Sequence, residues 1–154
     1  MSENRQENTD KYAALRLENQ ICFPLYACAK EIVRKYKPYL DELDLTYTQY
    51  IAMMVLWERK EVTVKELGAE LFLDSGTLTP LLKKLESKGY IVRKRMKSDE
   101  RNLCITITDQ GEALKEEAVK IPEKMRSCIH LGEEEAKKLY EILHQMLQEY
   151  KSGY

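Results

Sequence analysis

The sequence predicts a mainly α-helical protein with a small β-hairpin wing, a winged helix-turn-helix with N- and C-terminal dimerisation helices. Three observations lead to this fold class. Two short amphipathic helical patterns lie either side of a tight turn, an alternating hairpin pattern follows them, and longer helical patterns occupy both ends of the chain. We expect a single domain over residues 1–154, with the winged unit at 46–108 and helical dimerisation regions at 12–45 and 109–154.

Length and composition narrow the function classes. The 154 residues are 44% hydrophobic and 33% charged, which is typical of a globular chain with its own core. No apolar run approaches the roughly 18 residues that span a bilayer, and the polar amino terminus lacks a signal-peptide core, so we expect a cytoplasmic protein without a membrane partner. The four cysteines show no paired spacing, which argues against a zinc site and a structural disulfide framework.

The first helical pattern has two alternative starting points. Asn19 can cap the helix, or Phe23 and Pro24 can open it. Either start leaves Cys22 at or near the amino terminus of the helix.

A capping box marks the start of the next helix. Thr46 and Gln49 have the spacing in which each side chain bonds the backbone amide of the other residue. Before it, we expect Pro38 to interrupt the first helix and residues 39–45 to form a short helical link. After it, the apolar face of the new helix should include Tyr50, Ile51, Met54, Val55 and Trp57.

The two central helical patterns carry their own start and stop signals. Thr63 and Glu66 form a second capping box, and Asp74 can cap the following helix, whose apolar face consists of leucines. Gly89 can end that helix, because a left-handed backbone costs glycine little.

The leading end of this leucine-faced helix is rich in hydroxyl groups. Pro80 lies in its first turns, or the regular helix starts at a Thr79 cap with Pro80 next. Both alternatives leave Ser75, Thr77 and Thr79 at the leading end. In isolation this is a surface helix, but after the tight turn of a helix-turn-helix it is the one expected to enter a major groove.

Helical patterns resume after the hairpin. Asp109 can cap a helix that Pro122 should kink. Gly132 precedes three consecutive glutamates, which favour the positive end of the last helix. That helix carries an apolar stripe that includes Leu139, Leu143 and Leu147.

Positive charge is concentrated on the leucine-faced helix and the hairpin. From Lys83 to Arg101 there are eight basic and three acidic residues, a net charge of +5 in a chain of net charge −1, so the remainder sums to −6. Such a patch is typical of a protein that binds a polyanion, whereas the alternative is a solvated charged face. Placed on a winged helix, the patch predicts double-stranded DNA as the partner.

The helices at both ends of the chain need a function of their own. Their apolar stripes would be exposed on a monomer unless they packed against something. We expect a homodimer whose two-fold interface consists of these helices, because helix-turn-helix dimers bind pseudo-palindromic operators. The alternative is that the end helices cover the core of a monomer.

A set of short segments is shared with a known family. They are Asn19-Gln-Ile-Cys-Phe-Pro-Leu-Tyr26, Leu45-Thr-Tyr-Thr-Gln-Tyr50, Leu73-Asp-Ser-Gly-Thr-Leu-Thr-Pro-Leu-Leu-Lys83 and Asp99-Glu-Arg101. The set resembles the organic-hydroperoxide-sensing repressors (OhrR type) of the MarR family, over about residues 15–130. The segment around Cys22 separates this subgroup from other MarR proteins.

The resemblance implies a dimeric repressor that leaves its operator when an organic hydroperoxide oxidises one cysteine. The family pattern makes this residue Cys22, with Tyr36 and Tyr47 as hydrogen-bond donors to its sulfur and Tyr26 nearby. A helix amino terminus and phenolic donors stabilise a thiolate, the form that attacks a peroxide. By resemblance, the resulting sulfenic acid is trapped as an intersubunit disulfide with Cys128, or alternatively by a small-molecule thiol.

The expected DNA-binding residues form two groups. Those on the leucine-faced helix are Ser75, Thr77, Thr79, Pro80, Lys83 and Lys84, with hydroxyls near bases or phosphates and lysines at phosphates. Those on the wing are Arg93, Arg95, Lys97, Asp99 and Arg101. By resemblance, Arg101 reaches into the minor groove while Asp99 holds its guanidinium, and Arg93 and Arg95 contact the DNA backbone.

Two other function classes are compatible with parts of the sequence. In the second class, a phenolic or lipophilic ligand at the dimer interface switches a MarR-type regulator, and Cys22 is incidental. An isolated helical cysteine is usually an inert core residue, which is also the expectation for Cys28 and Cys104. The third class, a thiol peroxidase, is disfavoured because no acid/base constellation or cofactor loop accompanies the cysteine, so we expect no enzyme activity, no cofactor and no metal.

Overall fold

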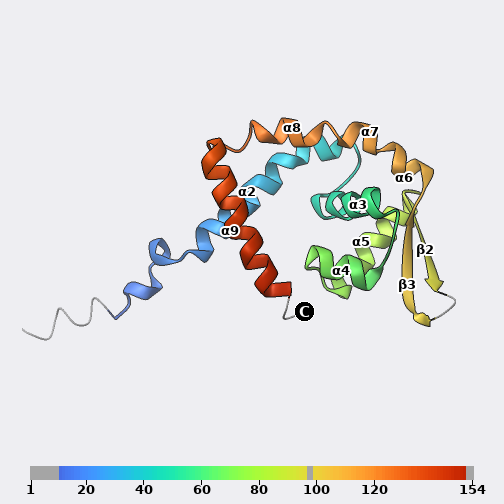
Figure 1. The fold of residues 1–154 in the computed structure, drawn as a ribbon, viewed down its shortest axis with the longest axis horizontal. Coiled ribbons are helices and arrows are strands. Elements are labelled where there is room, and N and C mark those ends of the chain that lie inside the picture. Colours follow the sequence, from blue (N-terminus) through green and yellow to red (C-terminus); the bar gives the residue numbers. More distant parts are fainter. Residues whose placement is uncertain (1–10, 97–98, 152–154) are drawn as a thin grey trace, which may run out of the picture. The chain divides into compact units, whose positions relative to one another are not determined.

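The computed structural model describes residues 11–96 and 99–151, with side chains for all of these except 96 and 99–102 (Figure 1). Its contacts divide the chain into two compact units, residues 1–35 and 36–154, and the boundary falls inside helix α2 (Cys22–Asp41).

The first unit contains two 3-10 turns, η1 (Ala13–Leu15) and η2 (Leu17–Asn19), and the start of α2. Asn19 lies in η2, and its side-chain amide donates to the Ala13 carbonyl at 2.8 Å instead of capping the helix. Helix α2 begins at Cys22, with Pro24 in its first turn, where the missing amide hydrogen costs least. Of the two predicted starts, the Phe23-Pro24 opening is therefore the correct one.

The predicted interruption at Pro38 is wrong. Helix α2 continues through Pro38 to Asp41, with Leu40 almost fully buried. Burial of Leu40 offsets the backbone hydrogen bond that proline removes. The helix ends at Asp41, and the turn that follows it closes at Asp44, which has a left-handed φ of 51°. The amide of Leu45 donates to the Leu40 carbonyl at 3.0 Å, so residues 39–41 belong to α2 and 42–45 form its closing turn rather than a separate helical link.

The centre of the second unit is a winged helix-turn-helix. It consists of α3 (Tyr47–Arg59), β1 (Glu61–Thr63), α4 (Val64–Leu71), α5 (Ser75–Ser87), β2 (Ile91–Met96) and β3 (Asp99–Ile107). The strands form an antiparallel sheet in the order β1-β3-β2, with Ile105 opposite both Val62 and Arg93. The sequence predicted the β2–β3 hairpin but not β1, because Thr63 ends this short strand and also caps α4.

The predicted helix signals of this centre are confirmed. Thr46 with Gln49 and Thr63 with Glu66 form capping boxes, and Asp74 caps α5. Gly89 has a φ of 77° and ends α5, with the amide of Tyr90 bonded to the Leu85 carbonyl at 3.1 Å. The core beneath these elements includes Met53, Leu56, Leu67, Leu78, Leu82, Leu85, Ile91 and Ile105.

The predicted apolar face of α3 is only partly correct. Tyr50 and Trp57 are buried, but Met53 and Leu56 replace the other expected residues, and Met54 is 46% exposed. The buried set repeats every three to four residues, whereas the prediction included neighbours at the edge of that stripe.

The segment after the wing differs from the prediction in its cap and its continuity. Thr108, not Asp109, is the N-cap, because its hydroxyl accepts from the Gly111 amide at 3.0 Å and donates to the Gly89 carbonyl at 2.6 Å. A carboxylate accepts but cannot donate, so aspartate could not make both bonds. Instead of one kinked helix there are three short ones, α6 (Asp109–Ala113), α7 (Lys115–Ala118) and α8 (Ile121–Arg126), and Pro122 lies in the first turn of α8.

The last helix, α9 (Glu133–Lys151), starts with the three glutamates, as predicted. None of its residues is buried in the single chain, although α9 carries the predicted stripe of leucines. Its end contacts α4 through Lys151, whose Nζ lies 3.7 Å from Glu70 Oε2. Across residues 11–96 and 99–151, the structure has no helix of the length and apolarity that crossing a bilayer requires.

Candidate redox centre and nucleic-acid interface

Helix α5 presents its polar residues to solvent and its leucines to the core. Asp74 Oδ1 accepts a hydrogen bond from the Thr77 amide at 2.8 Å. The hydrogen bonds from Thr77 hold the pKa of the Asp74 carboxyl below its usual value. The exposed residues on this helix are Ser75, Thr77, Thr79, Pro80, Lys83 and Lys84. The structure therefore places every DNA-binding candidate of this group on one accessible element.

Pro80 lies in the second turn of α5 and is exposed. The helix starts at Ser75 after the Asp74 cap, so the alternative start at Thr79 is excluded. The Thr79 hydroxyl donates instead to the Ser75 carbonyl at 2.8 Å, one turn earlier. Threonine commonly makes such a bond to the carbonyl one turn earlier in a helix.

Arg93 is held by an acid on the neighbouring helix. Its Nε and one terminal nitrogen lie 2.9 and 2.6 Å from Glu86 Oε2, and its backbone amide donates to Glu86 Oε1 at 3.0 Å. These bonds hold the pKa of the Glu86 carboxyl below its usual value, and only 20% of the Arg93 side chain is exposed. The geometry fastens β2 to α5, a role that the sequence did not indicate.

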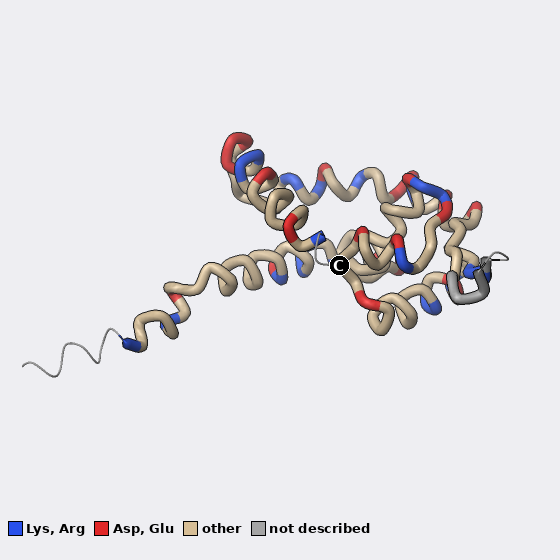
Figure 2. Tube along the Cα trace, turned by 60° about the horizontal axis from the view of Figure 1, so that its bottom comes forward, with Lys and Arg blue, Asp and Glu red and all other residues tan. Residues whose placement is uncertain are grey.

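The other wing candidates lie farther along the hairpin, where Lys and Arg residues gather (Figure 2). Arg95 is exposed on β2. Met96 pairs with Asp99 in the backbone register, so Asp99 and Arg101 belong to β3. Lys97, and the side chains of Asp99 and Arg101, lie outside the described residues.

Cys22 is the first residue of α2 and is exposed. Backbone amides at the start of a helix have no acceptor within the helix, so Cys22 lies beside unpaired donors. Tyr26 follows one turn later, 64% exposed, with the Lys30 ammonium 6.0 Å from its ring centroid.

Tyr36, Tyr47 and Tyr50 form an aromatic cluster in the second unit. The Tyr36 ring centroid lies 5.0 Å from that of Tyr47 and 5.9 Å from that of Tyr50. Burial raises the pKa of Tyr36 and Tyr47, and burial with the neighbouring phenols raises the pKa of Tyr50 to about 12. All three hydroxyls therefore keep their protons near neutral pH and can donate hydrogen bonds. The sequence named Tyr50 as core only; its spacing from Tyr47, about one helical turn, was the available signal.

The other cysteines differ in their surroundings. Cys128 follows α8 and is partly exposed, with its sulfur 3.7 Å from the Lys124 carbonyl. Cys104 lies on β3, and burial first, then the Glu61 carboxylate, raises the pKa of its thiol, which opposes reactivity. Cys28 is exposed, contrary to its expected core position, because the single chain leaves this part of α2 uncovered.

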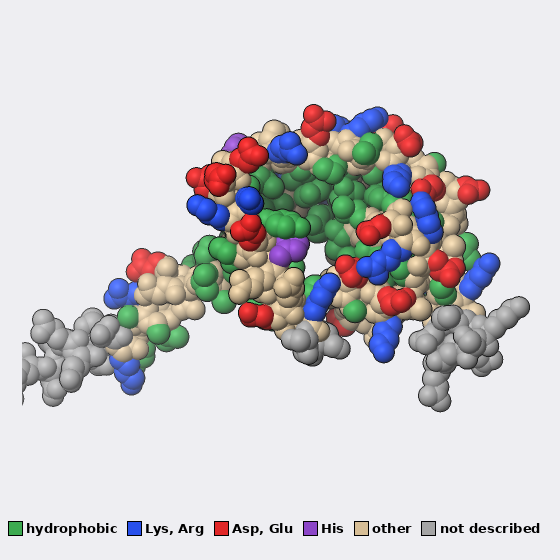
Figure 3. Space-filling view, in the orientation of Figure 1, with side chains coloured by type: hydrophobic (Ala, Val, Ile, Leu, Met, Phe, Trp, Pro, Cys, Tyr) green, Lys and Arg blue, Asp and Glu red, His purple; other side chains and the backbone are tan. Residues whose placement is uncertain are grey.

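An open apolar pocket of about 380 Å³ lies between α3 and α7–α8 in the second unit. Its lining includes Met54, Trp57 and Val119, and Figure 3 shows hydrophobic side chains gathered over these elements. Within the described residues, no group of three or more histidines, cysteines or acids could hold a metal ion.

The chain matches known regulators over most of its length. Residues 34–118 match the model of the transcriptional regulator SarA/Rot family. The organic hydroperoxide resistance transcriptional regulator of Bacillus subtilis is 46% identical over 139 residues, covering 90% of this chain and 95% of that protein. The regulator SarZ of Staphylococcus aureus is 50% identical over 120 residues, covering 78% of this chain and 81% of SarZ.

Solved structures agree in fold. AbfR of Staphylococcus epidermidis, 36% identical, has been solved bound to DNA in an overoxidised state and in a reduced state, each with a TM-score of 0.74. These matches cover 91% and 92% of this chain and 98% and 99% of AbfR. A disulfide-formed AbfR, 34% identical, matches with a TM-score of 0.64 over 94% of this chain and 98% of AbfR.

Proposed function

This chain belongs to the MarR family of transcriptional regulators, with the SarA/Rot and organic hydroperoxide regulators. From this membership we propose that it is a DNA-binding repressor that releases its operator when an organic hydroperoxide oxidises Cys22. The observation that carries the proposal is the exposed Cys22 at the first position of α2 in a chain that is 46% identical to a hydroperoxide resistance regulator. The relatives are regulators rather than enzymes, which argues against a thiol peroxidase.

The oxidation step needs only the thiol and the peroxide. The Cys22 thiolate attacks the terminal peroxide oxygen, a sulfur–oxygen bond forms, and the oxygen–oxygen bond breaks. The leaving alkoxide takes a proton and departs as an alcohol, while the cysteine becomes a sulfenic acid. Attack by a second thiol then forms a disulfide and releases water.

The phenol donors to Cys22 come from the partner subunit. Cys22 and Tyr36 belong to one continuous helix, α2, and are separated along it by about 21 Å at the standard rise per residue. This spacing along one helix supports hydrogen bonds between subunits rather than within one chain. In a two-fold dimer, Tyr36 and Tyr47 of one subunit complete the site around Cys22 of the other.

The second thiol is Cys128 of the partner subunit. AbfR has been solved in reduced, overoxidised and disulfide-formed states, and the overoxidised protein was bound to DNA. That structure favours a disulfide, rather than further oxidation of one sulfur, as the state that leaves DNA. The Cys22–Cys128 disulfide would join the start of α2 in one subunit to the end of α8 in the other.

The DNA interface consists of α5 and the wing. Helix α5 enters the major groove with Ser75, Thr77 and Thr79 at its leading end, and Lys83 and Lys84 meet phosphates. Arg95 and Lys97 add positive charge along the wing, and Arg101, oriented by Asp99, enters the minor groove. Pro80 lies among the exposed residues of α5.

The test is a titration of the chain onto the DNA upstream of its own gene, before and after one equivalent of cumene hydroperoxide. We expect binding to be lost on oxidation and restored by dithiothreitol, while Cys22→Ser binds DNA and ignores the peroxide. Cys28→Ser, an exposed cysteine on the same helix, is the control and should respond like the wild type. Peroxide release by Cys22→Ser would remove this residue from the mechanism. Binding by the wild type that ignores peroxide would point to a ligand-switched regulator.

Cys128→Ser tests the identity of the second thiol. We expect this variant to lose the covalent dimer on a non-reducing gel and to release DNA only when a small thiol accompanies the peroxide. A covalent dimer that persists in this variant would exclude Cys128.

A further inference from the structure

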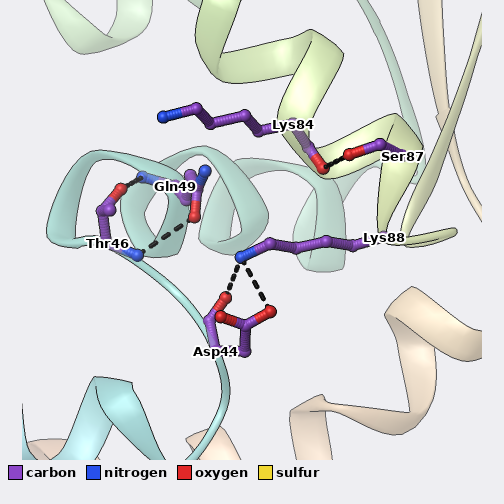
Figure 4. A network of polar contacts seen from close by, with 6 residues as sticks. All are labelled: Asp44, Thr46, Gln49, Lys84, Ser87 and Lys88. Atoms are coloured by element: carbon purple, nitrogen blue, oxygen red, sulfur yellow. Dashed lines mark hydrogen bonds and ion pairs between the residues drawn. The ribbon is translucent and has the colours of Figure 1, made fainter.

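One side chain connects the turn before α3 to the carboxyl end of α5 (Figure 4). Lys88 Nζ lies 3.1 Å from Asp44 Oδ2 and also donates to the Asp44 carbonyl oxygen. Only 23% of the Lys88 side chain is exposed, whereas 78% of the Asp44 side chain is, so the connection is shielded from solvent at the lysine end alone. The two residues are 44 positions apart in the sequence.

Both ends of this connection are held by backbone hydrogen bonds. At Asp44, the amide of Leu45 bonds the Leu40 carbonyl at 3.0 Å, and the Asp44 amide bonds the Asp41 carbonyl at 3.1 Å. At Lys88, the cap of α5, the backbone amide bonds the Lys84 carbonyl at 3.1 Å. The Ser87 hydroxyl donates to that same carbonyl at 2.8 Å. Lys88 therefore joins two hydrogen-bonded helix ends rather than two loops.

The Asp44 turn leads directly into the tyrosine cluster. Thr46 caps α3 in a capping box with Gln49, which is buried, and Tyr47 is the first residue of α3. A shift of the Tyr47 ring therefore moves the Asp44 turn with it, because the cap holds the intervening backbone. Lys88 passes this shift to the last turn of α5, where Lys84 lies.

We propose that Lys88 is a positioning residue that couples the Tyr47 end of the redox centre to the DNA-reading helix α5, so that its bond to Asp44 sets how strongly oxidation weakens DNA binding. This inference rests on the proposed function. The disulfide that oxidation forms at the sulfur that the tyrosines face displaces the phenols. Without Lys88, the turn keeps its internal hydrogen bonds but loses its polar connection to α5.

The experiment measures operator affinity of the full chain by fluorescence anisotropy, reduced and after one equivalent of cumene hydroperoxide. In Lys88→Met, the apolar stem stays and the donor is lost. We expect the ratio of oxidised to reduced Kd to fall roughly three- to tenfold, a change of the size that one hydrogen bond with a solvent-exposed partner produces. Lys88→Arg, which can still reach the aspartate, should restore the ratio.

Two further variants separate coupling from folding and from charge. Asp44→Gly removes the carboxylate at a left-handed position that glycine tolerates, so it should lower the ratio with little change in Tm. Lys84→Met should weaken binding in both redox states by the same factor and leave the ratio unchanged.

An unchanged ratio in both Lys88→Met and Asp44→Gly would overturn the inference while leaving the proposed function intact. A lower Tm or weaker reduced binding with an unaltered ratio would show a purely structural role and would also overturn it. A wild type that keeps its DNA after oxidation would instead contradict the proposed function, and the inference would fall with it.

Discussion

The phenol hydroxyls of Tyr36, Tyr47 and Tyr50 lie close enough together to affect each other's ionisation. Their rings are packed at centroid distances of 5.0 and 5.9 Å, and burial raises the pKa of all three. A phenolate could not donate a hydrogen bond to a thiolate, whereas a phenol can. All three phenols therefore keep the donor form to a higher pH than an unperturbed tyrosine does.

The raised pKa of Tyr50 predicts a loss of stability in base. Its pKa is about 12 in the fold and about 10 in the unfolded chain, so the unfolded chain releases its proton first as the pH rises. The stabilisation is complete below pH 10 and is lost between pH 10 and 12, up to about 3 kcal/mol at 1.36 kcal/mol per unit.

Urea unfolding from pH 8 to 11.5 measures this effect. Tyr50→Phe should lose the steepest part of the pH dependence, and Tyr140→Phe on α9 is the matched removal of a phenol outside the cluster. A Tyr50→Phe variant with the wild-type slope would show that another group controls stability in base.

At the scale of elements, two side chains decide how the wing and the following helix attach to the centre. The Thr108 hydroxyl bonds both the Gly111 amide and the Gly89 carbonyl, so it starts α6 and also fixes the end of α5. The Arg93 guanidinium holds Glu86 and fastens β2 to α5. The wing is thereby attached at Arg93 in the first half of its first strand and at Thr108 directly after its second strand.

Thr108→Ala should lower the free energy of unfolding by about 1 kcal/mol, because it removes an N-cap and a partly buried donor together. Thr106→Ala, which removes a hydroxyl bonded to Glu61 on the exposed side of β3, is the control and should change stability by less than about 0.5 kcal/mol. Chemical denaturation checks both values. Equal losses of unfolding free energy in the two variants would mean that the Thr108 cap stabilises the fold no more than the Thr106 hydroxyl does.

Arg93→Met should lower the free energy of unfolding by about 1–2 kcal/mol, because Glu86 loses its charged partner. Operator affinity should fall as well, because the wing is no longer fastened to α5. Arg95→Met, on the exposed side of the same strand, should weaken DNA binding and lower its salt dependence while leaving stability nearly unchanged. If Arg93→Met lowers operator affinity without lowering stability, Arg93 contacts DNA and does not hold β2 against α5.

At the scale of the whole molecule, the single chain leaves apolar side chains of its terminal helices exposed. None of the α9 residues is buried, and Leu139 and Leu147 are 41% and 39% exposed. Large apolar side chains are also exposed at the start of α2. Surfaces of this kind on the terminal helices favour a dimer as the functional unit.

Leu139→Glu with Leu147→Glu should convert the dimer into a monomer, because two charges would enter an apolar stripe. Analytical ultracentrifugation checks the mass, and operator affinity should fall with it. Gln145→Glu adds a charge at another exposed position of α9 and should remain dimeric. A dimer that survives the double substitution would place the interface elsewhere.

The sequence by itself determined the features that depend on residues within a few positions of each other. The Thr46 and Thr63 capping boxes, the Asp74 cap and the Gly89 stop were all predicted and confirmed, because each consists of a short-range hydrogen bond or a local backbone preference. The positive charge between Lys83 and Arg101 and the motif around Cys22 are likewise properties of the chain alone.

Only the tertiary structure decided the contacts that join distant positions. In the fold, β1 pairs with β3, and α2 continues past Pro38. Thr108 rather than Asp109 caps α6, because its hydroxyl also reaches the Gly89 carbonyl. The tertiary structure also brought Tyr36 to Tyr50, Glu86 to Arg93 and Asp44 to Lys88. These pairings depend on the path of the backbone between the partners, and that path is set by burial of the shared core rather than by either residue's neighbours.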